Sequence, residues 1–191
     1  FAKSLGTTDK PVVVASDSRI SSDAFRSAVQ AGVMAIGPDV IDVGVTATPT
    51  ACLMVREKQA SGGIIITASH NPIEWNGIKL IGPDGMAIPA EQAEQIKKSF
   101  TMASPEHAGA TECGKRIAED NANERHIEKV LAACDKRLLD EIKYRKLKVT
   151  LDSTHGAGGV AGVKLLKELG CQVTEVETEP DGRFTRKPEP V

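Results

Sequence analysis

The sequence predicts an α/β protein: a three-layer α/β/α domain with a mixed, mainly parallel sheet, followed by a truncated second α/β domain of the same type. Short β-branched runs alternate with segments of helical periodicity, the pattern of a parallel sheet covered by helices. The pattern restarts near residue 147, so we expect one domain over residues 1–143 and the incomplete second one over 144–191. The composition, 40% hydrophobic and 26% charged, is that of a chain that folds around a core.

The first strands and helices follow one another closely. The expected strands are residues 12–15, 40–45 and 64–66, all rich in Val and Ile. Ser21 or Ser22 can cap a helix that Gly37-Pro38 ends, and Pro49 can open a second helix through about residue 59. The first of these helices has apolar residues at the helical period: Phe25, Val29, Val33 and Ile36.

A reversal and two further helical segments follow. Residues 77–81 and 86–88 flank Gly82-Pro83-Asp84-Gly85, a turn sequence. A helix rich in Glu and Lys is expected from Pro89 to about Phe100, and a loop over residues 103–116. From Glu119 to Leu139 the chain is charged and helix-prone. Its expected inward-facing residues are Ile127, Val130, Leu131 and Leu138.

The last part of the chain contains one strand–helix–strand unit. Residues 147–152 and 171–176 predict the strands, and residues 160–169 the helix between them. The turn His155-Gly156-Ala157-Gly158-Gly159 joins the first strand to the helix. One such unit is too small to close its own core. The chain begins at Phe1 and stops in the Pro-rich segment 188–191, so we expect it to be part of a longer protein.

Charge and composition exclude several classes of function. The net charge is −2 and only six aromatic residues occur, so neither a basic field nor a base-stacking surface for nucleic acid is present. No apolar run approaches the roughly 18 residues that a membrane helix needs. The four cysteines have no C-x-x-C spacing and no His at ligand spacing. They indicate reduced thiols of a cytoplasmic protein rather than disulfides or a zinc site.

The segment with the most chemistry is Thr67-Ala68-Ser69-His70-Asn71-Pro72, directly after the strand 64–66. Ligands of α/β sheets bind beyond the carboxyl ends of strands, which favours a functional loop. The alternative is an ordinary turn, in which Thr67 and Ser69 bond local backbone. Ser69 can carry a phosphoryl group if cations and N–H groups hold it. Lys79 and Arg19 are the candidate cations; each alone is more often a solvated surface charge, and their convergence on Ser69 is the sharper hypothesis.

This loop, with Asn76-Gly77-Ile78-Lys79 behind it, resembles the phosphoserine loop of the α-D-phosphohexomutases, the family of phosphoglucomutase, phosphomannomutase and phosphoglucosamine mutase. The resemblance covers nearly the whole chain and is weakest over residues 100–140. Its other matching segments are Ala15-Ser16-Asp17-Ser18-Arg19, similar to the family's G-R-D-x-R turn, residues 39–44, 48–50, 151–159, 180–184 and 188–190.

The resemblance implies a reversible mutase that interconverts hexose 1- and 6-phosphates. Phosphorylated Ser69 would give its phosphoryl group to the sugar, and the bisphosphate would reorient and return the other phosphate. Arg19 and Lys79 would be supporting cations, and His70 a hydrogen-bonding or proton-transfer group. Mg²⁺ would contact the phosphoserine of Ser69, and a hexose 1,6-bisphosphate would act as activator. The partners implied are a small phosphosugar and the protein's remaining domains; the oligomeric state is left open.

Four departures limit what the resemblance implies. Phe1-Ala2-Lys3 does not supply the family's F-G-T-S-G-x-R-G-like opening, and Ala15 and Ser16 replace the Gly and first Arg of the turn. The family's D-G-D-x-D-R metal loop is absent, so the Asp ligands of the metal would lie outside this chain. The sugar-contacting loop is absent too, so the hexose is not identified. Residues 69–79 and the short spacer 184–188 favour phosphoglucosamine or phosphomannose substrates.

Two other functions compete with a mutase. A binding or scaffold module of the same fold needs no metal loop. A serine hydrolase could use Ser69, but no G-x-S-x-G elbow surrounds it.

The glycine turn 155–159 could cradle a phosphate, but it lacks G-x-G-x-x-G spacing and a P-loop Lys, which favours a structural turn. Asp152 has no second carboxylate nearby in the sequence and is assigned no metal.

Overall fold

The computed structural model describes residues 1–6, 9–102 and 107–188. Its strands are β1 (Val12–Ser16), β2 (Val40–Val45), β3 (Gly62–Ile66), β4 (Ile78–Ile81), β5 (Arg116–Ala118), β6 (Lys148–Asp152) and β7 (Gln172–Val176). Its helices are the 3₁₀ turn η1 (Ala2–Leu5), α1 (Ser22–Met34), α2 (Thr48–Glu57), α3 (Ala90–Met102), α4 (Ala122–Ala133), α5 (Lys136–Arg145) and α6 (Gly159–Glu168). In the described part, no helix combines the length and the apolar character that crossing a membrane requires.

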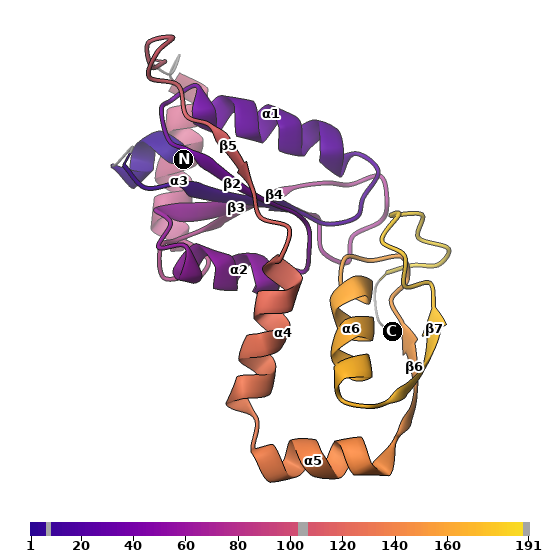
Figure 1. Cartoon of the computed structure of the whole chain (residues 1–191). Coiled ribbons are helices and arrows are strands. Elements are labelled where there is room, and N and C mark those ends of the chain that lie inside the picture. The colour runs from indigo at the N-terminus through magenta and orange to yellow at the C-terminus, as the bar shows by residue number, and fades with distance from the viewer. Residues whose placement is uncertain (7–8, 103–106, 189–191) are drawn as a thin grey trace.

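The strands form two separate sheets (Figure 1). The first has the order β4-β3-β1-β2-β5, in which β4 alone is antiparallel to its neighbour. The second contains β6 and β7, paired in parallel. This confirms the mixed, mainly parallel α/β fold that the alternation of strands and helices predicts. We call β6, α6, β7 and the segment to residue 188 the second unit.

The core of the first sheet follows from the period-two alternation of its strands. Val13 and Ala15 of β1 pack with Met54 and Val55 of α2 on one face. Val12 and Val14 pack with Val33 of α1 on the other face, where η1 also contributes. Burying one such side chain stabilises the fold by about 1.5–3 kcal/mol. A sheet buried on both faces explains why its strands are continuous apolar runs.

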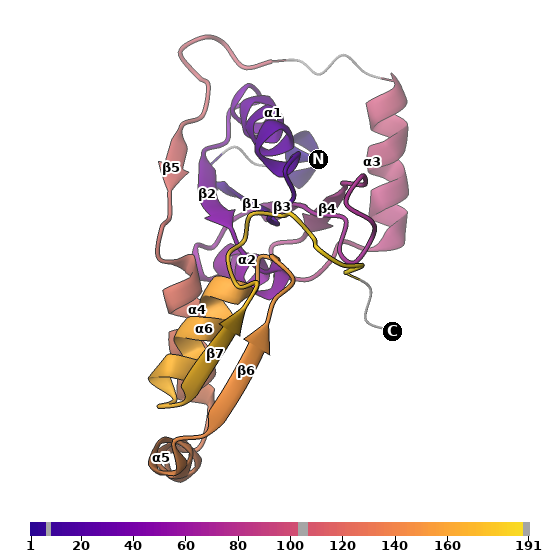
Figure 2. The same cartoon turned by 90° about the vertical axis from the view of Figure 1, so that its right-hand side faces the viewer.

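The carboxyl ends of β1, β2 and β3 lie at one edge of the first sheet, since these strands are parallel. The loops that leave this edge therefore meet. Figure 2 shows that the segment after β7 returns to the same edge. Helix α4 packs against both α2 and α6, and Lys164 pairs with Glu124, so the second unit is joined to the first sheet.

Several predicted elements differ from the structure. The helical segment expected over residues 119–139 forms two helices. Asp135 lies between them and caps α5, because its carboxylate accepts hydrogen bonds from the amides of Arg137 and Leu138. Leu138 is 51% exposed rather than inward-facing, and Phe25 of α1 is 49% exposed. Ile36 lies beyond the end of α1.

Strand β5 begins at Arg116, the last residue of the predicted loop; residues 103–106 of that loop lie outside the described residues. Strand β5 is short and its residues are exposed, which explains why hydrophobic patterning did not reveal it. The segment after the turn at residues 82–85 forms a single bridge, Ile81 to Ala87, rather than a strand.

Candidate functional site

The loop of residues 67–77 connects β3 to β4 and is closed at its base by a backbone hydrogen bond. The Thr67 amide donates to the Gly77 carbonyl at 2.9 Å. A side chain at position 77 would bring a Cβ within 3.1 Å of the Thr67 carbonyl oxygen, so glycine fits this close approach. The Asn76 amide donates to the hydroxyls of Ser21 and Ser22 at 2.9 and 3.1 Å, which ties the loop to the start of α1.

Ser69 is exposed at the tip of this loop in an unusual backbone conformation. Its φ is +58°, in the left-handed region that costs a non-glycine residue about 1–3 kcal/mol. Its amide donates to the Thr67 hydroxyl at 3.0 Å. The hydroxyl oxygen lies 3.5 Å from Nδ1 of His70, too long for a strong hydrogen bond. The fold therefore presents the Ser69 hydroxyl to solvent on a constrained backbone.

Arg19 lies beneath this loop with its side chain fully buried, at 0% exposure. A guanidinium has five N–H donors. Its Nε donates to Asp17 at 3.1 Å. Its two terminal nitrogens donate to four loop carbonyls at 2.7–2.9 Å, those of Ser69, Asn71, Pro72 and Trp75. All five donors are thus engaged, and Arg19 holds the loop from below.

Lys79 reaches the same loop from β4. It lies opposite Ile65 in the antiparallel β3–β4 pair, and opposite residues of such a pair project to the same face. Ile65 packs in the α2-side core, so Lys79 is on the α2 face. Burial raises the pKa of the Cys52 thiol in α2, and the positive charge of Lys79 opposes this. Lys79 and Ser69 line one open cavity of about 500 Å³.

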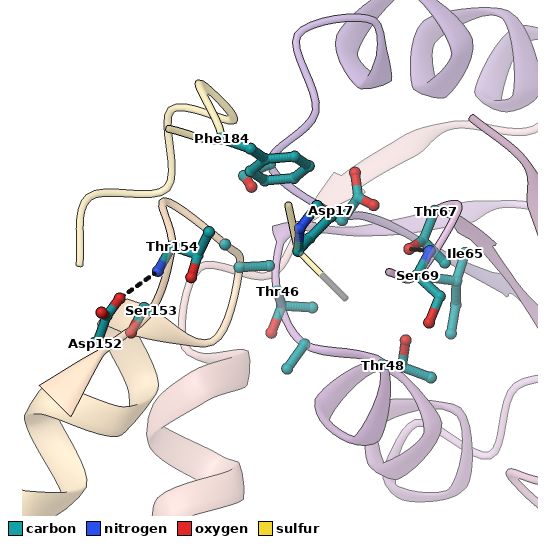
Figure 3. Close-up of a pocket in the computed structure, with 15 residues that line it drawn as sticks. Asp17, Thr46, Thr48, Ile65, Thr67, Ser69, Asp152, Ser153, Thr154 and Phe184 are labelled. Atoms are coloured by element: carbon teal, nitrogen blue, oxygen red, sulfur yellow. Dashed lines mark hydrogen bonds between the residues drawn. The ribbon is translucent and has the colours of Figure 1, made fainter. Parts of the chain in front are cut away.

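A second cavity, of about 300 Å³, separates the first sheet from the second unit (Figure 3). Ser69 and Thr67 line it together with Thr46 and Thr48 at the N-terminus of α2. The opposite wall comes from the second unit: Asp152, Ser153, Thr154 and Phe184. Hydroxyls and a helix N-terminus suit an anionic group. Ser69 therefore borders both this cavity and the one that it shares with Lys79.

The second unit is attached to the site by specific contacts. The Ser18 hydroxyl donates to the His155 carbonyl at 2.8 Å. Gly182 has φ +69° and packs so closely that a Cβ there would lie 2.0 Å from the Ser18 carbonyl oxygen. His155 Nδ1 lies 3.1 Å from an Asp181 carboxylate oxygen. These contacts hold the segment 180–184 against the turn after β1.

The carboxylates near the cavity are already engaged. Asp17 accepts from Arg19 and from the Ser22 hydroxyl, and Asp152 from Arg186 and the Thr154 amide. Across residues 1–6, 9–102 and 107–188, no three His, Cys, Asp or Glu side chains gather as a metal site requires. The described residues therefore do not fit a divalent cation by themselves.

Sequence reasoning located Ser69, His70, Lys79 and Arg19, and the structure brings all of them to one loop. It assigned no role to Asp17 or Phe184. Asp17 lies in the quoted turn 15–19 and orients Arg19; Phe184 lies in the quoted segment 180–184. The family resemblance included both residues, but only the tertiary contacts show what they touch.

Models of two adjacent domains match the chain. The model described as phosphoglucomutase/phosphomannomutase, alpha/beta/alpha domain I, matches residues 1–107. The model described as alpha/beta/alpha domain II of the same proteins matches residues 124–191.

Relatives with names from this group are similar over almost the full chain. A phosphoglucomutase/phosphomannomutase of Thermococcus kodakarensis is 39% identical over 180 residues, which is 94% of this chain and 39% of that protein. A probable phosphoglucosamine mutase of Methanosarcina barkeri is 38% identical over 187 residues, 97% of this chain and 41% of that protein. The chain spans about two fifths of the length of these relatives.

Solved structures show the same arrangement. A putative phosphomannomutase from Thermus thermophilus superimposes with a TM-score of 0.81 at 29% identity, over 100% of this chain and 43% of that one. A phosphoglucomutase/phosphomannomutase family protein from Burkholderia thailandensis gives 0.78 at 28% identity, over 97% of this chain and 39% of that one.

Proposed function

The chain belongs to the phosphoglucomutase/phosphomannomutase family, and on that premise we propose that it is the N-terminal part of a phosphohexomutase that interconverts hexose 1- and 6-phosphates. The observation that carries the proposal is the exposed hydroxyl of Ser69. It stands on a constrained loop and borders two cavities, one of which it shares with Lys79. Phosphoryl transfer requires chiefly such positioning and charge stabilisation.

In the proposed reaction Ser69 carries the phosphoryl group. The bond from phosphorus to the Ser69 oxygen breaks as a bond to a sugar hydroxyl oxygen forms. The proton of that hydroxyl passes to His70 or to water, and the Ser69 oxygen takes up a proton and becomes a free hydroxyl. The resulting bisphosphate reorients, and its other phosphate returns to Ser69. Lys79 would stabilise the charge of the transferring group, and His70 would bond it or accept a proton.

Arg19 has a different place in this proposal from the supporting cation that the sequence suggests. Its five donors are engaged by Asp17 and four loop carbonyls. That saturation supports a role in holding the loop and leaves Lys79 as the cation for the phosphate.

We propose that the complete protein uses Mg²⁺ and a hexose 1,6-bisphosphate activator, as the family resemblance implies. Since the described residues form no metal cluster, the carboxylate ligands would come from segments beyond this chain. We therefore derive no step through the metal. The hexose stays open among phosphoglucosamine, phosphomannose and phosphoglucose.

The division of the chain is likewise a proposal. We place the boundary between residues 143 and 144, ahead of β6, whereas the match to the domain II model starts at residue 124, inside α4. We also propose a cytoplasmic location. The four cysteines support it, because all are free thiols, as a reducing compartment would keep them.

A non-catalytic module of the same fold is the alternative. The coexistence of Ser69, His70 and Lys79 at one loop favours the enzyme, because a scaffold needs none of them there. A serine hydrolase would need a strong bond from Ser69 to a base, and the 3.5 Å separation from His70 does not provide one.

Intact-mass measurement of the complete protein, before and after phosphatase treatment, tests the proposal. We expect one removable phosphoryl group, mapped by peptide sequencing to Ser69 and discharged by hexose phosphate. Ser99→Ala, on the exposed face of α3, is the matched control that should keep the modification. An unmodified Ser69 that reacts with a fluorophosphonate would support hydrolysis instead.

A further inference from the structure

We propose that Arg19 and Phe184 are positioning residues for Ser69, and that Phe184 makes the order of the phosphoserine loop depend on the docked second unit. The inference rests on the proposed function of Ser69 for its catalytic meaning. Its structural part, the coupling of Phe184 to the loop, can be tested without any mutase activity.

The first step is the backbone of Ser69. A left-handed conformation is uncommon for serine and persists only where the surroundings hold it. Arg19 donates directly to the Ser69 carbonyl at 2.9 Å. The neighbouring bond from the Ser69 amide to Thr67 fixes the other side of the same residue. Ser69 is thus held on both sides, and Arg19 supplies the contact from outside the loop.

The second step is the reach of Arg19 across the loop. Besides Ser69, it binds the carbonyls of Asn71, Pro72 and Trp75, which spreads one planar group over seven residues of chain, from 69 to 75. Asp17 fixes the guanidinium through Nε and is itself held by the Ser22 hydroxyl. The position of the loop is therefore fixed relative to the turn between β1 and α1.

The third step is the cover over Arg19. The guanidinium carbon lies 5.2 Å from the centre of the Phe184 ring, a cation–π distance. Phe184 comes from the second unit, and its segment is seated by Gly182 against the Ser18 carbonyl. The Arg19 side chain is completely buried in this arrangement. Bonds shielded from water are stronger than the same bonds in contact with it.

The fourth step is the location of Phe184 relative to Ser69. Phe184 lines the cavity that Ser69 also lines (Figure 3). It also lines the neighbouring cavity, to which His70 contributes. An aromatic side chain of the second unit therefore borders both cavities beside the loop. Removing the ring would admit water to the Arg19 guanidinium and loosen its four carbonyl bonds.

The test uses the complete protein and hydrogen–deuterium exchange of the peptide that covers residues 67–77. Phe184→Leu keeps an apolar side chain and removes the ring; we expect loop amides to exchange about 3- to 30-fold faster, the range of a desolvated cation–π contact. Phe184→Tyr keeps the ring and should exchange as the wild type does. Phe100→Leu, at an 88% exposed position of α3, is the matched control and should change nothing.

The same variants are then measured for transfer of the phosphoryl group from Ser69 to a hexose phosphate. We expect Phe184→Leu to lower kcat with little change in KM, and Phe184→Tyr to restore it. A general loss of structure would instead lower the melting temperature and speed exchange throughout the chain. Should Phe184→Leu not fold, Phe184→Met carries the same comparison with a side chain of similar volume.

The outcomes separate the two proposals. Unchanged exchange in Phe184→Leu, or equal acceleration in Phe184→Tyr, overturns the coupling of Phe184 to the loop. Accelerated exchange in a protein whose Ser69 never carries phosphate supports the coupling of Phe184 to the loop and contradicts the proposed mutase function. Accelerated exchange with unchanged phosphoryl transfer overturns the claim that Phe184 positions Ser69 for the reaction.

Discussion

Lys79 lies directly opposite Ile65 in the antiparallel pair of β4 and β3. Ile65 is almost wholly buried against α2, so the pairing commits Lys79 to the same face at the sheet's edge. A shift of the pairing by one residue would turn Lys79 to the α1 face, away from the cavity it shares with Ser69. Strand register therefore places Lys79 beside the loop that carries Ser69.

We expect Lys79→Ala to slow phosphoryl transfer in the complete protein by about 10²- to 10³-fold, the usual effect of removing one stabilising group. Its exposed side chain contributes little packing, so the melting temperature should hold. Lys98→Ala, on the exposed face of α3, is the control and should change neither quantity. Parallel losses of activity and melting temperature would point to a structural role for Lys79.

Ser69→Ala should abolish mutase activity and leave the fold intact. In the proposed reaction Ser69 supplies the oxygen that receives phosphate, and an exposed loop hydroxyl adds little to stability. Steady-state turnover and circular dichroism check the two halves of this expectation. Near-normal turnover in the alanine variant would mean that Ser69 is not the phosphorylated residue.

The sequence predicted the elements whose signals are local. Buried β-branched runs revealed β1, β2 and β3, and the loop after β3 followed from their parallel arrangement. Strand β5 escaped because an exposed three-residue edge strand carries no hydrophobic pattern. The break between α4 and α5 depended on a single cap at Asp135.

The candidate site divides in the same way. Ser69 and Lys79 were found because they belong to one contiguous motif. The role of Arg19 could not be predicted, since it depends on carbonyls 50 to 56 positions away, whose orientation no residue type specifies. The role of Phe184 could not be predicted for the same reason, because its contact with Arg19 forms only when the second unit docks.

Arg19→Lys should destabilise the protein although it conserves the charge. An ammonium has three donors where the buried guanidinium uses five, so loop carbonyls and the Asp17 carboxylate would lose partners. Breaking such a buried set costs about 3–5 kcal/mol. Urea unfolding measures this, with Arg137→Lys on exposed α5 as the control. An unchanged midpoint would contradict the arrangement described for Arg19.

Asp42 should make stability depend on acid pH. Burial raises the pKa of this carboxyl. The bonds from Arg116 and the Gly44 amide lower the pKa by a larger amount, so the net pKa lies below its usual value. A carboxyl whose pKa is depressed on folding stabilises the protein above about pH 4, and this contribution is lost as pH falls through the folded-state pKa.

We therefore expect Asp42→Asn to lower the free energy of unfolding at pH 7 by about 1–3 kcal/mol, the value of hydrogen bonds to a charged group. The difference from the wild type should shrink below about pH 4, where the Asp42 carboxyl of the unfolded wild-type chain begins to protonate while that of the folded chain is still charged. Urea titrations at pH 7 and pH 3 measure both differences, and Asp140→Asn on exposed α5 is the control. A difference that is constant with pH would show that the charge of Asp42 does not matter.

The 191-residue chain, expressed alone, should fold at least through its first sheet and show no mutase activity. The first sheet is covered on both faces by apolar side chains, which is sufficient for a stable core. The second sheet has two strands, and Leu147 beside it and Val160 of α6 are exposed, so this unit should associate with other surfaces. In the described residues no metal cluster is available to act with phosphorylated Ser69.

Two measurements check this expectation. In amide exchange, β1, β2 and β3 should be the most strongly protected strands. Coupled assays with glucose, mannose and glucosamine phosphates and a 1,6-bisphosphate activator should register no turnover. Turnover near the rate of the complete enzyme would mean that residues described here as structural complete the active site.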